Sequence, residues 1–161
     1  MKKKTNLIIA FILLILINGC SGYKPIFGSV DLQFEISEYS IEGNQTLGKK
    51  IYRKINYFLK KTKPEKNVRK ITLVINVSKD KKVLLKDATG KIIEYKIFLK
   101  TEVEVKDFMT NDKILNQTFS NSSSYRVQNQ YSETIRLENL STESMLEKTF
   151  QDLLIKLSQN I

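Results

Sequence analysis

The sequence contains no histidine and only one cysteine, Cys20. The absence of histidine excludes Ser-His and Cys-His nucleophile pairs, histidine proton shuttles and the commonest zinc sites. Glycine-rich nucleotide-binding motifs, CxxC and HExxH are also absent. Carboxylate chemistry remains possible, but Glu102 and Glu104, which share one face of a predicted strand, are expected to be a solvated pair. We therefore expect a protein that is not an enzyme and that holds no metal or cofactor.

The N-terminus has the parts of a secretory signal. Basic residues at Lys2–Lys4 precede an apolar run, Leu7–Ile17, which is about half of the roughly 20 residues that a membrane-spanning helix needs. The following Ile17-Asn18-Gly19-Cys20 resembles the lipobox of bacterial lipoproteins. That resemblance implies cleavage of residues 1–19, diacylglycerol on the Cys20 thiol and an acyl chain on its new amine. Residues 20–29 then form a lipidated tether, and because Ser21 rather than Asp follows Cys20, we expect the periplasmic side of the outer membrane.

Basic side chains outnumber acidic ones, 27 to 17, and the formal net charge is +10. A basic protein outside the cytoplasm is not expected to meet nucleic acid. Its expected partners are phospholipid headgroups, lipopolysaccharide phosphates or an acidic protein. Because lipidation would consume the only cysteine, no disulfide is expected and stability must come from packing.

Hydrophobic periodicity predicts one domain over residues 30–161. The predicted elements, in order, are a strand from Val30 to Ile41 with a register slip near Ser37, a helix from Gln45 capped by Asn44 and ended by Pro64, strands over Ile71–Val77, Ile93–Val105 and Ile114–Arg126, and a long helix from about Ser132. The last of these strands is polar in its second half, which is typical of an edge strand.

This order predicts an α+β fold, a four-stranded mixed sheet with two amphipathic helices packed on one face. The first strand–helix–strand unit favours a parallel pair, and the remaining strands favour a meander. The predicted core consists of Leu32, Phe34, Leu47, Ile51, Ile55, Phe58, Ile71, Leu73, Ile75, Ile97, Leu99, Val103, Leu146, Phe150, Leu153 and Leu157, and Ile135 and Leu140 are candidate additions to the stripe of the last helix.

The segment Lys79–Lys91 differs from an ordinary loop because apolar residues, Val83-Leu84-Leu85, lie inside a basic stretch. We interpret it as an exposed hairpin arm. Its candidate anion-binding residues are Lys79, Lys81, Lys82, Lys86 and Lys91, opposed within the segment only by Asp80 and Asp87. The lysines together with the apolar residues fit an amphiphile with a phosphorylated headgroup.

Alternative roles for these basic residues stay open. The arm could be a solvated hairpin whose lysines only maintain solubility. The basic helix residues from Lys49 to Lys61 compete for the same ligand, although they could instead face the acidic last helix or a partner protein. A weaker candidate is a sugar site lined by Tyr125, Tyr131 and nearby amides.

The residues Cys20-Ser21-Gly22-Tyr23-Lys24-Pro25-Ile26-Phe27-Gly28 resemble the start of the LptE family of lipopolysaccharide-assembly lipoproteins. Further points of similarity are the spacing of the first helix, Asp87-Ala88-Thr89-Gly90, the strand Ile93–Val105, and a Ser-rich strand that ends in Tyr125. The chain departs from the family pattern at Ser21 and at Asn139-Leu140-Ser141-Thr142, where we expect the last helix to kink or to begin late.

The resemblance implies an outer-membrane subunit of the lipopolysaccharide translocon. Such a subunit plugs and helps to assemble the LptD β-barrel, and it binds lipopolysaccharide. The alternative is a generic outer-membrane lipoprotein that binds an anionic envelope polymer or an acidic protein through its basic faces.

The lipobox generates the first prediction. The variant Cys20→Ala should remain uncleaved by the lipoprotein signal peptidase and unlabelled by a fatty-acid probe, because the sequence holds no other thiol. Normal labelling of this variant would contradict the assignment of Cys20.

Overall fold

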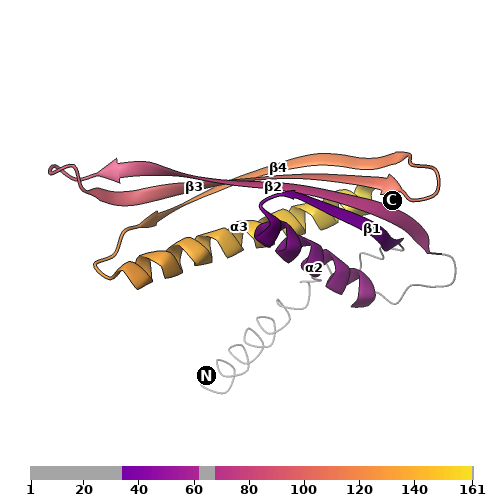
Figure 1. The fold of residues 1–161 in the computed structure, drawn as a ribbon, viewed down its shortest axis with the longest axis horizontal. Coiled ribbons are helices and arrows are strands. Elements are labelled where there is room, and N and C mark those ends of the chain that lie inside the picture. Colours follow the sequence, from indigo (N-terminus) through magenta and orange to yellow (C-terminus); the bar gives the residue numbers. More distant parts are fainter. Residues whose placement is uncertain (1–33, 62–67, 161) are drawn as a thin grey trace, which may run out of the picture. The chain divides into compact units, whose positions relative to one another are not determined.

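A computed structural model describes residues 34–61 and 68–160. The predicted signal peptide and tether, Cys20, Leu32 and Pro64 lie outside these residues. The described elements are β1 (Phe34–Gly43), α2 (Gln45–Lys61), β2 (Arg69–Lys86), β3 (Ile92–Asp107), β4 (Lys113–Arg126) and α3 (Tyr131–Asn160) (Figure 1). No helix among the described residues is long and apolar enough to cross a membrane.

The strands form one mixed sheet in the order β1-β2-β3-β4, which confirms the predicted α+β architecture. β1 pairs in parallel with β2, and the pairs β2–β3 and β3–β4 are antiparallel. The register of β1 shifts between Ile36 and Glu38, where the slip was predicted. A two-residue turn cannot join parallel strands, so α2 lies in the crossover between β1 and β2.

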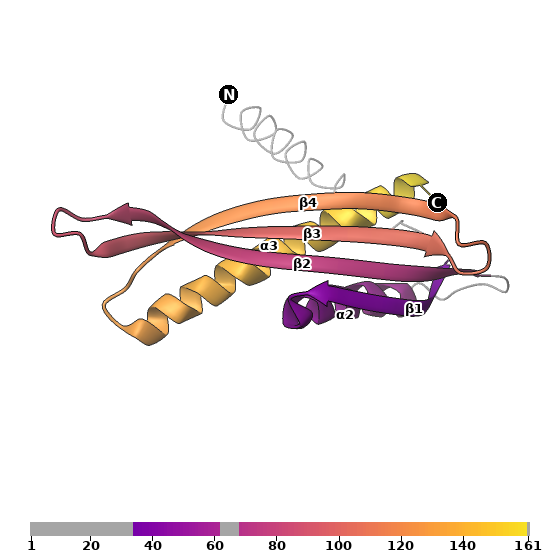
Figure 2. The same ribbon diagram turned by 45° about the horizontal axis from the view of Figure 1, so that its top comes forward.

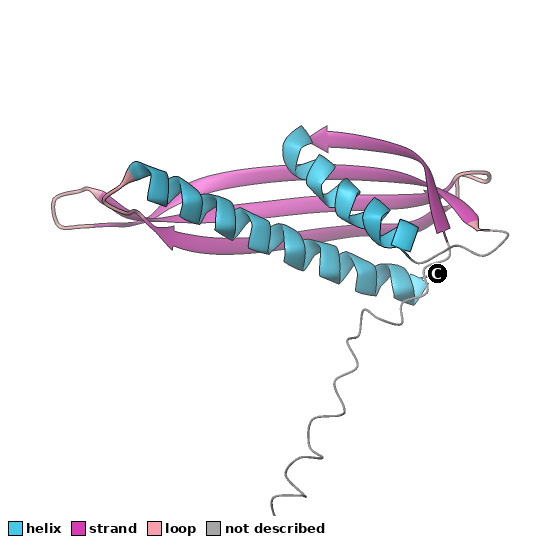
Figure 3. Cartoon of the chain, turned by 90° about the horizontal axis from the view of Figure 1, so that it is seen from below, coloured by secondary structure: helices cyan, strands magenta, loops and turns pink. Residues whose placement is uncertain are grey.

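Both helices lie on the same face of the sheet (Figures 2 and 3). α2 packs against β1 and β2, and α3 packs against β3 and β4. Odd-numbered residues of β2, β3 and β4 point toward the helices, so the buried positions of β2 are Ile71, Leu73, Ile75 and Val77. The opposite face of the sheet carries polar residues, which is the alternation expected of a sheet covered on one side.

The connection between β1 and α2 requires particular residue types at three positions. Gly43 has φ 66°, and a Cβ atom at this position would lie 2.3 Å from the carbonyl oxygen of Val77. The Asn44 side chain accepts a hydrogen bond of 3.1 Å from the amide of Leu47, which confirms it as the N-cap. A Cβ atom on Gly48 would lie 2.4 Å from a methyl group of Ile41, so this glycine lets the helix approach β1 closely.

The predicted core is largely confirmed. Phe58 and Phe150 are exceptions because both are only half-buried, and they meet edge to face with ring centroids 6.3 Å apart. Besides the predicted residues, the buried core contains Leu59, Val77, Val105, Leu115, Phe119, Tyr125, Met145 and Leu154. The additions in the sheet lie on the same odd-numbered face as the predicted core, so the buried face extends further along β2, β3 and β4.

α3 is one continuous helix from Tyr131, so the predicted kink or late start at residues 139–142 is wrong. Thr142 donates a hydrogen bond of 2.8 Å to the carbonyl oxygen of Glu138, and Thr149 donates one of 2.9 Å to that of Met145. These bonds satisfy the hydroxyl groups inside the helix, so polar residues are buried without breaking it. The suggestion that Leu140 extends the apolar stripe is also wrong, because its side chain is 52% exposed.

The two helices carry opposite charge and pair with each other. Lys50 forms an ion pair with Glu143, and Lys54 Nζ lies 2.6 Å from Glu147 Oε2. All four side chains are more than a third exposed, so these pairs orient the helices more than they stabilise them. Two lysines of the basic helix thus face α3.

Burial along α3 generates the second prediction. Leu153 is fully buried, so Leu153→Ala should lower the free energy of unfolding by about 2–5 kcal/mol, through lost burial and the cavity left behind. The matched change Leu140→Ala removes the same atoms from an exposed site and should change stability by about 0.5 kcal/mol or less. Urea denaturation of both variants measures the difference, and equal losses would show that this face of α3 is misplaced.

Candidate functional site

The segment Lys79–Lys91, predicted to be an exposed hairpin arm, continues the hairpin of β2 and β3 past the last buried apolar residue of β2, and with its pairing partners in β3 we define the arm as residues 79–99. Lys79 pairs with Leu99 at its base, and Lys86 pairs with Ile92 at its tip. The register shifts twice between Val83 and Lys86. The side chains of Val83, Leu84 and Leu85 are 45–50% exposed, so the arm displays apolar surface to solvent.

The turn at the tip of the arm is built on Asp87. Its Oδ1 atom accepts hydrogen bonds from the amide and hydroxyl groups of Thr89 and from the amide of Lys91. Gly90 has φ 87°, a conformation that favours glycine. The hydrogen bond from the Thr89 side chain, together with those from the two amides, lowers the pKa of Asp87. The carboxylate of Asp87 therefore stabilises the turn through these hydrogen bonds.

The structure does not bring the five candidate lysines together on one surface. Lys79 and Lys81 lie on the face of the sheet that the helices cover. Lys82 lies on the opposite face, where its Nζ atom is 5.5 Å from the ring centroid of Phe98, and Lys96 reaches the same ring at 5.2 Å. Lys86 and Lys91 are exposed at the tip.

Glu138 of α3 is a third acidic partner that the sequence analysis missed. Its Oε1 atom lies 2.7 Å from Lys79 Nζ, and its Oε2 atom lies 3.0 Å from Lys81 Nζ. The Tyr125 hydroxyl donates a hydrogen bond of 2.7 Å to Oε2. The Glu138 side chain is only 14% exposed, so one nearly buried carboxylate receives three donors from β2 and β4.

Two aromatic rings lie beside this cluster. Tyr95 and Tyr125 stack with centroids 5.8 Å apart, and Lys81 Nζ lies 4.9 Å from the centroid of the Tyr95 ring. Burial and the hydrogen bond to Glu138 raise the pKa of Tyr125, which keeps its hydroxyl group protonated as a donor. Burial by itself would raise the pKa of Glu138, but the bonds from Lys79, Tyr125 and Lys81 outweigh it and lower this pKa to about 2.

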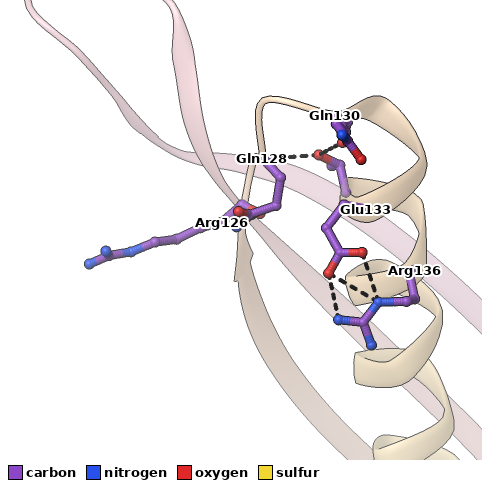
Figure 4. Close-up of polar contacts among 6 residues, drawn as sticks. Arg126, Gln128, Gln130, Glu133 and Arg136 are labelled. Carbon is purple, nitrogen blue, oxygen red and sulfur yellow. Dashed lines mark hydrogen bonds and ion pairs between the residues drawn. The ribbon is translucent and has the colours of Figure 1, made fainter.

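Polar contacts also hold the start of α3 (Figure 4). The Thr134 hydroxyl oxygen accepts a hydrogen bond of 2.9 Å from the amide of Gln128, and Arg136 binds the carboxylate of Glu133 through two of its nitrogens. Thr134 is the one buried side chain in residues 131–141, whereas residues 142–157 bury seven. The first third of α3 therefore buries fewer side chains than the rest, and it is attached through the bond to Gln128 and through the half-buried side chains of Ile135 and Leu137.

The remaining sequence candidates have ordinary surroundings. Glu102 pairs with Lys100, and Glu104 pairs with Lys106 and Lys113, so the strand carboxylates are in solvated ion pairs. Tyr125 is buried against Glu138, whereas Tyr131 is 79% exposed, so they do not line a common sugar site. Within residues 34–61 and 68–160, no group of three or more acidic or cysteine side chains is placed to hold a metal ion.

No protein-family model and no curated protein matches the sequence. The fold does match solved structures. An uncharacterized lipoprotein B from Nitrosomonas europaea superposes with a TM-score of 0.61 at 17% identity, covering 85% of this chain and 90% of that one. A putative lipoprotein from Caulobacter crescentus gives 0.54 at 9%, covering 83% and 93%. A minor lipoprotein from Acinetobacter baumannii gives 0.53 at 15%, covering 79% and 94%. The chain therefore shares the fold of bacterial lipoproteins.

The Glu138 cluster generates the third prediction. Because the folded-state pKa of about 2 lies below the ordinary 4.5, the ionised carboxylate stabilises the fold above pH 4.5 and loses this contribution as the pH falls toward 2. Glu138→Gln should therefore cost about 1–3 kcal/mol near neutral pH and less at about pH 3. Urea denaturation at both pH values measures this, and a cost that does not depend on pH would contradict the assignment.

Proposed function

We propose that this protein is a lipid-anchored outer-membrane subunit of the lipopolysaccharide translocon, acting as plug and assembly factor of an LptD-like β-barrel. In this proposal Cys20 carries the anchor, and the arm binds the phosphorylated, acylated part of lipopolysaccharide. The observation that carries the proposal is the amphiphilic arm on a fold shared with lipoproteins. Exposed Val83, Leu84 and Leu85 lie in the same hairpin as the exposed tip lysines, Lys86 and Lys91.

An amphiphile with an anionic headgroup needs both kinds of surface. Near an anionic surface each lysine contributes on the order of 1 kcal/mol, and salt weakens this attraction. The exposed apolar residues supply the complementary contact for acyl chains, at about 25 cal/mol for each Å² removed from water. A purely solubilising hairpin would have no use for three exposed aliphatic residues in succession.

The outer face of the sheet supports a place inside a barrel. The lumen of an outer-membrane barrel is polar. Along β4 this face carries small hydroxyl and amide side chains, which are Asn116, Thr118, Ser120, Ser122 and Ser124. All of them are exposed and uncharged, so they suit contact with a polar wall without leaving a buried charge unpaired.

The proposal includes no catalytic activity. The strand carboxylates sit in exposed ion pairs, and Glu138 is held ionised by three donors, so neither is poised to transfer a proton near neutral pH. Turnover of an envelope substrate that is abolished by changing one carboxylate, in a variant that still folds, would overturn this part of the proposal.

The fourth prediction tests the function directly. When native membranes are solubilised, the protein should co-purify with a stoichiometric β-barrel partner, and the complex should remain intact at high salt. If only an anionic polymer or an acidic protein is recovered, and high salt releases it, the generic lipoprotein that binds through its basic faces becomes the better description.

The arm is tested in the same preparation. Changing Lys79, Lys81, Lys82, Lys86 and Lys91 together to Gln should weaken lipopolysaccharide binding at moderate salt and keep the barrel partner. A second variant, with Lys49, Arg53 and Lys60 of α2 changed to Gln, removes three charges from another surface and tests the basic helix as the competing ligand site. Unchanged affinity of the arm variant would move the ligand site elsewhere, and loss of the barrel alone would make the arm a protein interface.

A further inference from the structure

Three donors converge on one carboxylate beneath the base of the arm. Lys79 and Lys81 come from β2, Tyr125 comes from β4, and all three lie within 3.0 Å of an oxygen atom of Glu138. These groups form a preorganised site for an oxyanion, and the anion that occupies it belongs to the protein itself. We call Lys79, Lys81 and Tyr125 the oxyanion site.

Glu138 lies in the part of α3 that buries the fewest side chains. Residues 131–141, which we call the cover, bury only Thr134. Two apolar side chains of the cover, Ile135 and Leu137, are half-buried, and its polar bonds to the rest of the domain include the hydrogen bond from Gln128 and the bonds of Glu138. Segments with few buried apolar contacts open at low free-energy cost. The rest of the helix is anchored by buried leucines such as Leu146 and Leu153, so the cover can separate while α3 stays docked.

We propose that Glu138 occupies the oxyanion site as an internal competitor, and that a phosphate group of an anionic amphiphile replaces its carboxylate when the cover moves aside. A phosphate monoester carries a charge of about −1.5 to −2 and three acceptor oxygens, so it satisfies the same three donors with more charge than one carboxylate. The two lysines follow the new anion on their flexible stems. This inference rests on the proposed function and adds to it how the site is closed and opened.

Displacement of the cover also exposes surface for the rest of the ligand. The stacked rings of Tyr95 and Tyr125 lie beside the oxyanion site, and they continue toward the exposed aliphatic residues of the arm through the pair Val83–Tyr95. An amphiphile whose phosphate reaches Lys79 and Lys81 can therefore lay its apolar part along the arm. The cover keeps this surface closed until an anion competes with Glu138.

The test compares Glu138→Gln with Glu143→Gln in the full-length protein. Both variants remove one carboxylate from α3, but Glu143 pairs with Lys50 of α2 and lies outside the oxyanion site. Glu138→Gln should bind lipid A about tenfold more tightly than the wild type, a gain of about 1.4 kcal/mol, because the competing anion is gone. Glu143→Gln should bind like the wild type. Adding Lys79→Gln and Lys81→Gln to Glu138→Gln should remove the gain, and dephosphorylated lipid A should show none.

Glucosamine 1-phosphate separates the phosphate from the acyl chains. If Glu138→Gln gains affinity for this soluble phosphate while no variant binds lipid A, the oxyanion site stands and the lipopolysaccharide function fails. If the wild type and Glu138→Gln bind lipid A equally, with circular dichroism showing an intact fold, the function stands and the internal competitor is overturned.

Hydrogen exchange of the wild type provides a measurement that needs no variant at Glu138. Amides of residues 131–141 should exchange faster than those of residues 142–157, and lipid A should accelerate exchange in the first group only. Thr134→Ala, which removes the bond to Gln128, should also tighten lipid A binding while leaving all three donors in place. Protection of residues 131–141 by lipid A would overturn the proposal, even if Glu138→Gln failed to fold.

Discussion

The ladder between β2 and β3 is longer than the apolar core beneath it, and this mismatch organises the rest of the domain. On β2 the buried apolar positions end at Val77, whereas pairing with β3 continues to Lys86. Backbone hydrogen bonds can extend a hairpin past its core, but they cannot supply burial. Beyond Val77 the inward positions are Lys79 and Lys81, so any element that covers them must bring negative charge.

α3 both covers the apolar core and brings negative charge to the lysines, along one continuous helix. Its C-terminal part buries leucines against β3 and β4, and its N-terminal part brings Glu138 to the lysines. The two parts are stabilised by different physics. Burial of leucine side chains is insensitive to pH and to competing anions, whereas a carboxylate shared by two lysines and a tyrosine responds to both. The buried part of α3 and the proposed ligand-sensitive cover therefore belong to one helix.

The two faces of the sheet also differ in what they carry. The helix-covered face provides the core and the oxyanion site, and the outer face provides uncharged polar residues along β4 and the Phe98 cluster with Lys82 and Lys96. The arm extends both faces, and the residues of its tip are all exposed. In the proposed function the sheet contacts the polar wall of the barrel and the arm contacts the amphiphile.

Most of the secondary structure could be predicted from the amino-acid order, because its signals are local. Alternation over Ile71–Val77, the Asn44 cap and the slip near Ser37 all depend on neighbours within a few residues, and all were confirmed. The architecture followed from them, since amphipathic helices and a one-sided sheet must bury their apolar faces together. The prediction of a lipid anchor and the resemblance that motivates the translocon proposal also come from the sequence.

Which charges meet depends on the three-dimensional packing. Glu138 lies 57 residues from Lys81 along the chain, and no local pattern marks it among the acidic residues of α3. Local helix propensity likewise could not predict that α3 continues through residues 139–142. There Thr142 is buried and donates a hydrogen bond to the carbonyl oxygen of Glu138, whereas Leu140 faces solvent. Side-chain partners across elements depend on how the helix crosses the sheet, which is set by packing of the whole core and not by any single segment.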